Sequence, residues 1–512
     1  MRRLSAFLLI IVLVFSLCGC ITNKSPYIPT GNGLSDGSTT IPTASQNPDQ
    51  VISLPYYPDR SLNPYECTDY VNRTILSLVY QGLFSVDAQY NVSPMLCKSF
   101  NRSRDMKTYT FTLEDAHFSD GTRLTAADVA ASLNAARSAG YFSGRFDQIR
   151  SISATADSVV QINLTAPYEN LPLLLDVPIV PQSQLKAPRP LGSGPYVFAD
   201  EGGSFSLRRN GNWWCQASTP ITAKQIGLVP AEDPAQLVFA FEQKGSALGM
   251  VVADPGSVNY ADFHKDSELW DCETGIFLYL GCHAGSKVFS NDDVRQALTY
   301  AVDRNLLASQ YYRGFATPTV LPVSPKSPVY ASGLASRVSY DPARLTEAVK
   351  NAGLTGQSVT LLVNSSDGIR LRAARAIAAM LSQCGLKVTT SEQSDSSYRK
   401  ALSNGKFDLF LGQTKLSPNM DLSAFFASKG ALSYGSMNDP ILYALCQESL
   451  ANAGNYYTLY QKIMEDAQLC PLLIRSYAVY AQRGAFEGLK PARDNVFYYT
   501  TGKTLEQALL PE

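Results

Sequence analysis

Histidine is scarce in this sequence, and the few histidines are scattered. Only three occur, His117, His264 and His283, and no two of them stand four residues apart. After the first twenty residues no Cys-x-x-Cys pair exists, and the remaining cysteine spacings suit no zinc site. The sequence therefore predicts no metal centre, and we expect no cofactor.

The sequence also has almost no net charge, because its positive and negative side chains are nearly equal in number. The chain has 43 lysines and arginines against 44 aspartates and glutamates. A protein that binds nucleic acid needs an excess of basic side chains on one face to contact the phosphates. The overall composition shows no such excess. We therefore expect no nucleic-acid partner.

Recognisable catalytic motifs are missing as well. Residues 33–37 match the G-x-S-x-G pattern of hydrolases, but they lie in a polar stretch rather than between a strand and a helix. Residues 502–504 resemble the end of a phosphate-binding loop, but Phe497 stands where that loop requires glycine. We find no activated nucleophile and no paired catalytic carboxylates. The sequence predicts a protein that is not an enzyme.

The only long apolar run is too short to cross a membrane. Residues 4–17 are almost entirely apolar and follow Arg2 and Arg3. As a helix they would span about 21 Å, whereas a membrane span needs roughly 20 residues. The pattern is typical of a signal peptide, which we place at residues 1–19.

The end of this segment resembles a bacterial lipobox. It reads Leu17-Cys18-Gly19-Cys20, with leucine three residues before a cysteine and a small residue just before it. The resemblance implies cleavage before Cys20 and a diacylglyceryl group, with acyl chains such as palmitate, on the Cys20 thiol. Two acyl chains suffice for stable membrane anchoring. The alternative is an ordinary secreted protein in which Cys20 is incidental.

The next stretch predicts a flexible tether at residues 20–49. Ser, Thr, Gly, Pro and Asn make up 19 of the 30 residues from 21 to 50. Such a composition cannot bury enough apolar surface to fold alone. About 460 residues follow, too many for one core, so we expect two or three domains.

Local patterns in the body predict both strands and helices. Residues 107–113 alternate apolar and polar, as in a half-buried strand. After an Asp-Gly turn at 120–121, Thr125 and Asp128 form a capping-box pattern, and the helix that follows should bury Val129, Leu133 and Ala136. A second amphipathic helix is expected over residues 292–308.

Between residues 359 and 412 strands alternate with helices. The pattern predicts strands at 359–364, 386–392 and 407–412, with helices at 367–384 and 398–404. Such alternation implies parallel pairing, and ligands bind such sheets beyond the carboxyl ends of the strands. The loops that follow the first and third strands are therefore candidate ligand-binding segments.

Several segments, in a shared order, resemble the large solute-binding proteins of oligopeptide and dipeptide importers. The resemblance extends over about residues 50–500. It rests on the following segments: NPY at 63–65, ILSLVYQGLF at 75–84, TYTFTL at 108–113, FSDG at 118–121, LTAADV at 124–129, GSGPY at 192–196, DDVRQALTYAVDR at 292–304, GFATP at 314–318 and YYTLYQKIMEDAQLCP at 456–471.

The resemblance implies an α/β fold with two lobes that close like a clamp, of the class II periplasmic-binding-protein type, with an extra domain inserted in the first lobe. The first lobe would comprise residues 50–84, 191–285 and 476–512. The insert would be 85–190 and the second lobe 286–475. The chain would cross between the lobes near 285 and 475, and the ligand would bind between them.

In this family an acidic residue after a Gly-Trp pair often binds the amino group of a peptide. Here Gln413 replaces the tryptophan, and Lys415 or Leu416 stands where the acid is expected. Asp421 is the nearest carboxylate. The resemblance thus makes Gln413, Lys415 and Asp421 candidate ligand contacts. The missing acidic residue implies a ligand without a free amine, another binding register or a ligand that is not a peptide. Lys415 would then meet an anionic group, or be a solvated loop lysine.

Three further residues are candidate ligand contacts. Tyr279 would face the cleft on a strand that a bound peptide could extend, or would instead be packed between the lobes. Tyr65 is a similar candidate. Arg372 could approach a ligand carboxylate from the start of a helix, although an exposed arginine on an amphipathic helix is the simpler interpretation.

Eight cysteines lie in the body of the chain. An exported protein can oxidise them, but eight cysteines allow 105 pairings and the sequence does not choose among them. The pairs closest in sequence to test are Cys67 with Cys97 and Cys272 with Cys282.

The expectations converge on a monomeric receptor outside the cytoplasmic membrane, on the cell surface or in the periplasm. It would capture peptides and deliver them to the permease and ATPase subunits of an ABC importer. The alternatives keep the fold but change the ligand to an oligosaccharide, a metal chelate or a signalling peptide. An exported hydrolase or a structural lipoprotein would be a different class of protein.

Overall fold

The computed structural model describes residues 43–44 and 52–510, apart from 143, 202–203, 217–222, 244–245, 247, 255–266 and 488. The predicted signal peptide, Cys20 and nearly all of the predicted tether lie outside the described residues. Thr43 and Ala44 form a two-residue strand, β1, that pairs with β19 (Phe486–Glu487) near the other end of the chain. Within the described residues no helix is both long and apolar enough to span a membrane.

One body of the molecule is built on a four-stranded sheet in the order β2-β11-β10-β9. Its elements are β2 (Ile52–Tyr56), α2 (Tyr70–Val79), β9 (Tyr196–Glu201), β10 (Ser204–Arg209), β11 (Gln225–Pro230), α4 (Pro234–Glu242) and β12 (Met250–Ala253). Asp69 begins α2 by accepting hydrogen bonds from the backbone N–H groups of Val71 and Asn72. The helix buries Ile75 and Val79 and leaves Arg73 half-buried.

A second, antiparallel sheet in the order β5-β6-β8-β7 lies within the segment predicted as the insert. The four strands of this sheet are β5 (Cys97–Arg102), β6 (Thr108–Leu113), β7 (Ile149–Ala156) and β8 (Val159–Leu164). The same part of the chain also contains β3 (Phe84–Val86), β4 (Val92–Pro94), α3 (Ala126–Arg137), η1 (Gly140–Phe142), η2 (Leu171–Leu174) and η3 (Gln182–Gln184). The predicted strand at 107–113 is confirmed as β6. The capping box of Thr125 and Asp128 is also confirmed, and Val129, Leu133 and Ala136 are fully buried.

The other body contains the predicted α/β segment. Its elements are α5 (Asp292–Ala301), α6 (Arg304–Leu306), η5 (Leu307–Tyr311), β14 (Ala316–Pro318), α7 (Ser332–Ala335), α8 (Pro342–Asn351), β15 (Ser358–Asn364), α9 (Gly368–Gln383), β16 (Lys387–Gln393), α10 (Asp395–Ser403), β17 (Leu409–Lys415), α11 (Ser423–Phe426), α12 (Pro440–Ala451), η6 (Ala453–Asn455) and α13 (Tyr456–Asp466). β15 pairs in parallel with both β16 and β17, as predicted. Gly385 follows α9 with a φ of +94°, the left-handed conformation that glycine adopts at a helix end.

The helix expected over residues 292–308 is shorter than predicted. α5 ends at Ala301 because Val302 adopts an extended conformation. Asp303 then begins a new turn by accepting a hydrogen bond from the Leu306 backbone N–H, and Arg304 turns inward to donate to the carbonyls of Thr319 and Pro471. Tertiary hydrogen bonds to one arginine therefore outweigh the continuous apolar stripe.

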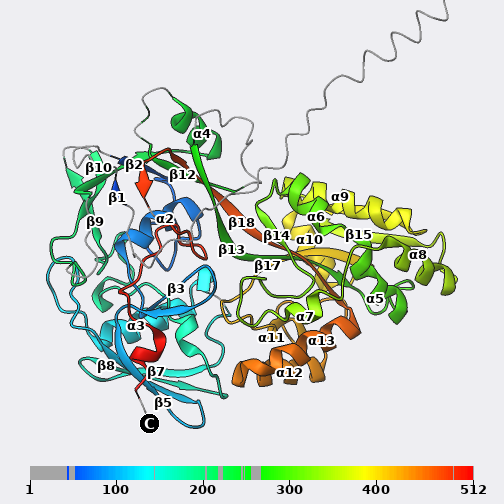
Figure 1. The fold of residues 1–512 in the computed structure, drawn as a ribbon, viewed down its shortest axis with the longest axis horizontal. Coiled ribbons are helices and arrows are strands. Elements are labelled where there is room, and N and C mark those ends of the chain that lie inside the picture. The colour runs from blue at the N-terminus through cyan, green and yellow to red at the C-terminus, as the bar shows by residue number, and fades with distance from the viewer. Residues whose placement is uncertain are drawn as a thin grey trace, which may run out of the picture.

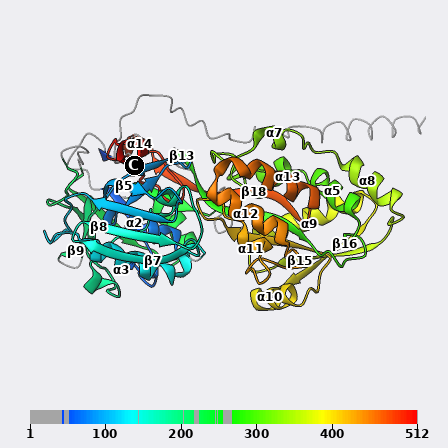
Figure 2. The same cartoon turned by 90° about the horizontal axis from the view of Figure 1, so that it is seen from below.

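Two long antiparallel strands, β13 (Ser267–Cys282) and β18 (Leu469–Gln482), join the two bodies. Figures 1 and 2 show them running from the body that contains β2 and α2 to the body that contains α5 to α13. At one end β18 pairs with β12, and at the other end β13 pairs with β17. One sheet in the order β12-β18-β13-β17-β15-β16 therefore extends through the molecule. The expected two-lobed α/β clamp is the observed fold.

The register of β13 against β18 shifts between Glu273 and Ile276. Gly275, inside this irregularity, has a φ of +71°. The Thr274 hydroxyl stabilises the turn by donating to the Arg475 carbonyl at 2.8 Å and accepting from the Ile276 N–H at 3.0 Å. Strand irregularities of this kind bend a strand locally. We take this point as the place where β13 passes from one lobe to the other, about ten residues before the expected 285; the exact lobe boundaries stay a prediction.

The proposed disulfides are not formed. All eight body cysteines are buried, and neither of the two proposed pairs is bonded. Cys272 and Cys282 are ten residues apart on β13, roughly 33 Å of extended strand, whereas a disulfide requires Cα atoms within about 7 Å. Cys67 and Cys97 each donate instead to a carbonyl two residues ahead, those of Asp69 and Ser99.

A substitution on β17 tests the close approach of β17 and β13. A Cβ at Gly412 would lie 2.7 Å from the Tyr279 hydroxyl and in steric conflict with its buried ring. We expect Gly412→Ala to lower the free energy of unfolding by about 1–3 kcal/mol because the core is overpacked there. Gly333→Ala is the matched control, since nothing lies within 4 Å of its added Cβ. Urea unfolding of both variants gives the comparison, and equal stabilities would contradict the packing described.

Candidate functional site

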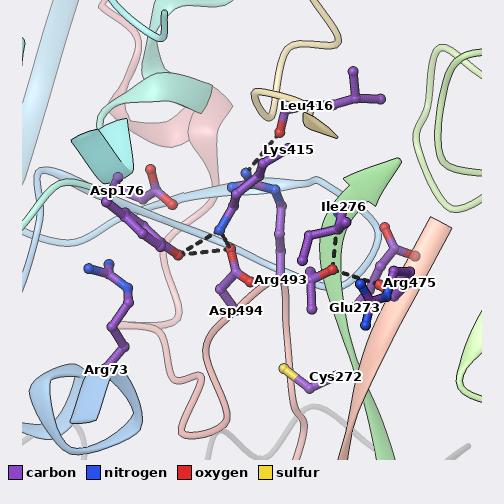
Figure 3. Close-up of polar contacts among 12 residues, drawn as sticks. Arg73, Asp176, Cys272, Glu273, Ile276, Lys415, Leu416, Arg475, Arg493 and Asp494 are labelled. Atoms are coloured by element: carbon purple, nitrogen blue, oxygen red, sulfur yellow. Dashed lines mark hydrogen bonds and ion pairs between the residues drawn. The ribbon is translucent and has the colours of Figure 1, made fainter. Parts of the chain in front are cut away.

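Lys415 reaches from one lobe to the other. It is the last residue of β17, and its ammonium forms an ion pair with Asp494, in the C-terminal segment of the other lobe. The ammonium also donates to the Tyr141 hydroxyl at 2.8 Å and lies 4.0 Å from the centre of the Tyr141 ring. Tyr141 in turn donates to Asp494 at 2.9 Å. Figure 3 shows the lysine and the aspartate pointing toward one another.

The Asp494 carboxyl is held in its charged form. Burial by itself raises its pKa, but the neighbouring Lys415 and Arg493 charges and the hydrogen bonds from Lys415 and Tyr141 lower it below the ordinary value. A carboxyl with a lowered pKa in the folded state stabilises that state at pH values above the ordinary pKa of aspartate. The stabilisation is lost as the pH falls through the lowered value.

A second charged group lies at the same crossing. Arg475 on β18 has a side chain only 5% exposed. It donates to the Gln413 side chain at 2.7 Å and to Asp254 at 2.7 Å, and lies 3.5 Å from Asp367, the residue that begins α9. Its contacts therefore come from both lobes. Sequence reasoning missed Arg475, although a single charge inside the apolar run 469–482 was the available signal.

A cavity of about 110 Å³ lies beside the Lys415–Asp494 pair, between α2, η1, β3 and the C-terminal segment. Charged side chains line it: Arg73, Arg145, Asp176, Arg493 and Asp494. Arg145 forms an ion pair with Asp176, and burial lowers the pKa of Arg145 below its ordinary value. Apolar and aromatic side chains, including Phe84 and Phe142, and uncharged polar side chains, including Gln81 and Asn495, form the rest of the wall. The mixture of apolar walls and convergent polar groups is typical of small-molecule sites.

A smaller space of about 20 Å³ lies near this cavity and is lined by Lys415. Residues of both lobes line it, with Lys415 from one lobe facing Asp494, Arg73 and Tyr477 from the other. Tyr141 and Arg73 border both spaces. The candidate site is therefore the pair of neighbouring cavities around Arg73, Tyr141 and Asp494, which Lys415 borders from the opposite lobe.

A larger groove, about 530 Å³, lies elsewhere, against α5, α8 and α13. Every residue that lines it lies within residues 293–471, so it belongs to one lobe. A groove on one lobe cannot couple ligand binding to closure of the two lobes, and we do not take it as the primary site.

Of the six expected ligand contacts, two lie at the crossing between the lobes. Gln413 contacts Arg475 there, and Lys415 contacts Asp494. Tyr279 is 2% exposed, and its ring packs against Phe277, Phe410 and Phe425. Burial raises its pKa well above the ordinary value.

The other three expected contacts lie apart from Lys415. Tyr65 is buried, and its hydroxyl donates to the Pro178 carbonyl at 2.9 Å. Arg372 is exposed on α9. Asp421 lies in the loop before α11, accepts from the Ser423 N–H, and has its pKa raised by burial.

Among the described residues no three His, Cys, Asp or Glu side chains lie close enough to hold a metal ion. The polar groups at the crossing are instead guanidinium, ammonium, carboxylate and amide groups. Such a set can bind an organic solute through charge-assisted hydrogen bonds.

Comparison with known sequences gives one family. The pattern of the bacterial extracellular solute-binding proteins, family 5 (middle region), matches residues 91–433. The glutathione-binding protein GsiB of Salmonella typhi is 28% identical over 386 residues, which cover 72% of this chain and 73% of that protein.

Solved structures share the fold. The ABC transporter substrate-binding protein CtaP from Listeria monocytogenes aligns with a TM-score of 0.73 at 19% identity, covering 88% of this chain and 98% of that one. The oligopeptide-binding protein AppA from Bacillus subtilis, solved with a nonapeptide, aligns with a TM-score of 0.63 at 20% identity, covering 90% and 100%.

Removing the anion of the bridging pair tests its role. We expect Asp494→Asn to lower the free energy of unfolding by about 1–3 kcal/mol at neutral pH, because it leaves the Lys415 ammonium without its charged partner. We expect the difference between wild type and variant to shrink as the pH falls from the ordinary aspartate pKa through the lowered value, where the carboxyl of the folded wild type becomes protonated. Urea unfolding across the acid range measures both effects.

A double-mutant cycle with Lys415→Met supplies the control. If Lys415 and Asp494 interact, the two substitutions together cost less than the sum of each alone. Strict additivity, or an undiminished difference at acid pH, would contradict a bridging ion pair.

Proposed function

Because the chain belongs to the bacterial extracellular solute-binding proteins of family 5, which deliver solutes to ABC importers and are not enzymes, we propose that it captures peptides or peptide-like solutes. It binds them between its two lobes and hands them to the permease and ATPase subunits as a monomer. The observation that carries this proposal is the cluster of charged side chains from both lobes around Lys415, beside a cavity with polar and aromatic walls.

Two relatives support a peptide-like ligand. One is named for glutathione, and one was solved with a nonapeptide. Tyr141 and Phe142 at the cavity provide flat aromatic surfaces, and Arg73, Arg145 and Asp176 provide charged partners for the polar groups of a short peptide.

Lys415 alters the expected mode of binding. Its ammonium stands near the place expected for the acidic residue that binds a peptide amine, and it is paired with Asp494. A ligand ammonium at this point would meet a like charge, which is unfavourable. We therefore propose that the solute presents its amine elsewhere or has none.

Closure of the lobes would accompany binding. Only β13 and β18 span the two bodies as continuous strands in the described part of the chain, and β13 is irregular at the crossing. A ligand that contacts both lobes binds the closed state more tightly and so shifts the population toward it. We propose residues 273–276 and the facing residues near Arg475 as the hinge.

A thermal-shift screen of the full chain in mild detergent tests the ligand class. We expect glutathione or di- to pentapeptides to raise the melting temperature, since a ligand at 100 times its dissociation constant stabilises by about 2.7 kcal/mol. Oligosaccharides and metal chelates serve as the comparison. A response to one of these and not to peptides would retain the receptor function and refute the peptide assignment.

We also propose that the protein is anchored outside the cytoplasmic membrane by lipid on Cys20. We expect Cys20→Ser to move the protein from the membrane fraction to the soluble fraction and to abolish labelling by radioactive palmitate. Cys18→Ser is the matched control and should retain both properties. Membrane retention of the Cys20→Ser variant would contradict lipid anchoring.

A further inference from the structure

The charges around the cavity do not balance. Three guanidinium groups and two carboxylates line it, and the Lys415 ammonium lies beside it. Both carboxylates are already engaged, Asp176 with Arg145 and Asp494 with Lys415. Arg73 and Arg493 thus have no carboxylate within ion-pair distance among the described residues.

Both of these arginines also have an unsatisfied polar atom. The Nε atoms of Arg73 and Arg493 are buried and find no hydrogen-bond partner in the part of the chain that the structure describes. The whole of Arg493 is only 6% exposed. Burial by itself lowers the pKa of Arg493, but the nearby Asp494 and Asp176 charges outweigh burial and raise it, so this guanidinium stays charged. A buried N–H donor without an acceptor still destabilises a protein. Two such donors, on two side chains that line one cavity, favour a ligand that brings hydrogen-bond acceptors.

The remaining contacts hold the two guanidinium groups in place. Arg73 stacks on the Tyr141 ring with its central carbon 3.3 Å from the ring centre, and it donates to the Cys67 carbonyl at 3.1 Å. Arg493 donates to the Leu416 carbonyl at 3.3 Å. Figure 3 shows Arg73 coming from α2 and Arg493 from the C-terminal segment. Their positions are therefore set before any ligand arrives.

We propose that Arg73 and Arg493 hold a carboxylate of the transported solute, so that the receptor selects acidic solutes. The inference rests on the proposed receptor function. A planar guanidinium matches the two oxygens of a carboxylate and can donate two parallel hydrogen bonds to it. A neutral sugar or an amidated peptide offers no charge to offset the two cations. Lys415, close by on the other lobe, adds to the positive potential that attracts the solute.

Matched pairs of probes test the inference on the full chain in mild detergent. The pairs are glutathione with its dimethyl ester, and trialanine with its C-terminal amide. Isothermal titration calorimetry should show that the free acid of at least one pair binds roughly 10- to 100-fold more tightly than its neutralised form, as expected for a hydrogen-bonded ion pair. Arg73→Gln and Arg493→Gln should each weaken binding of the acid by a similar factor and leave the neutralised form unaffected.

Arg399→Gln is the control for loss of a positive charge, because Arg399 is on the surface of α10 with its side chain 76% exposed. The Arg399→Gln variant should bind the acid and its neutralised form as tightly as the wild type does. Arg73, which is less buried than Arg493, keeps the test decisive if Arg493→Gln fails to fold.

Three results would overturn the inference. Equal binding of the acid and its neutralised form would leave the receptor function standing and refute the carboxylate site. The carboxylate site would also be refuted if both arginine variants kept the preference for the acid. It would be refuted as well if inorganic phosphate displaced every carboxylate probe at equal concentration. Failure of every probe, together with neutral sugars and metal chelates, would instead refute the proposed function as well.

Discussion

The burial of Arg475 constrains the whole centre of the molecule. A guanidinium that is almost fully buried must find anionic or carbonyl partners, because an isolated charge in an apolar interior is far too costly. Burial by itself lowers its pKa, but Asp254 and Asp367 raise it above the ordinary value, so it stays charged. Asp254, Asp367 and Gln413 lie 221, 108 and 62 residues from Arg475 in the sequence. Satisfying one side chain on β18 therefore fixes the relative positions of β12, β17 and α9.

The irregularity in β13 places further charged groups around the same point. Glu273, immediately before the shift, accepts a hydrogen bond from the Tyr90 hydroxyl at 2.6 Å, and its backbone carbonyl accepts from the Asp494 N–H at 2.9 Å. The Gly275 carbonyl accepts from the Leu416 N–H at 2.9 Å. The bend in the connecting strand thus brings the C-terminal segment, with Arg493 and Asp494, next to the end of β17, with Lys415. Fold and site depend on one local distortion.

The sequence predicted those elements whose stability is local. The helix α3 was predictable because its capping residues and its apolar stripe act within a few residues. The parallel pairing of β15 with β16 and β17 was predictable because strands alternate with helices in this segment. Residues 292–308 failed as one helix because Arg304 binds carbonyls up to 167 positions away, which no local pattern reveals.

The site was less predictable than the fold. The chemical departure at Gln413 and Lys415 was visible from a family pattern, but their partners were not. Asp494 lies 79 residues from Lys415 in the sequence, and Tyr141 lies 274 residues from it. Arg73 and Arg493 appear in the sequence as ordinary charged residues of a helix and a C-terminal segment. Only the folded chain shows that they share a cavity and that, among the described residues, neither has a carboxylate within ion-pair distance.

The distribution of charge between the lobes bears on how a solute would promote closure. Arg73 and Arg493 belong to the body that contains α2 and the C-terminal segment, whereas Lys415 comes from the other body. An anion bound to the two arginines would add negative charge next to Asp494 and increase the attraction for Lys415. The gain exists only when Lys415 is near, that is, when the lobes are together. A solute can shift the equilibrium only by such a difference in affinity between the two states. A neutral solute in the same cavity would lack this difference, so the charge arrangement links recognition of an acidic solute to closure.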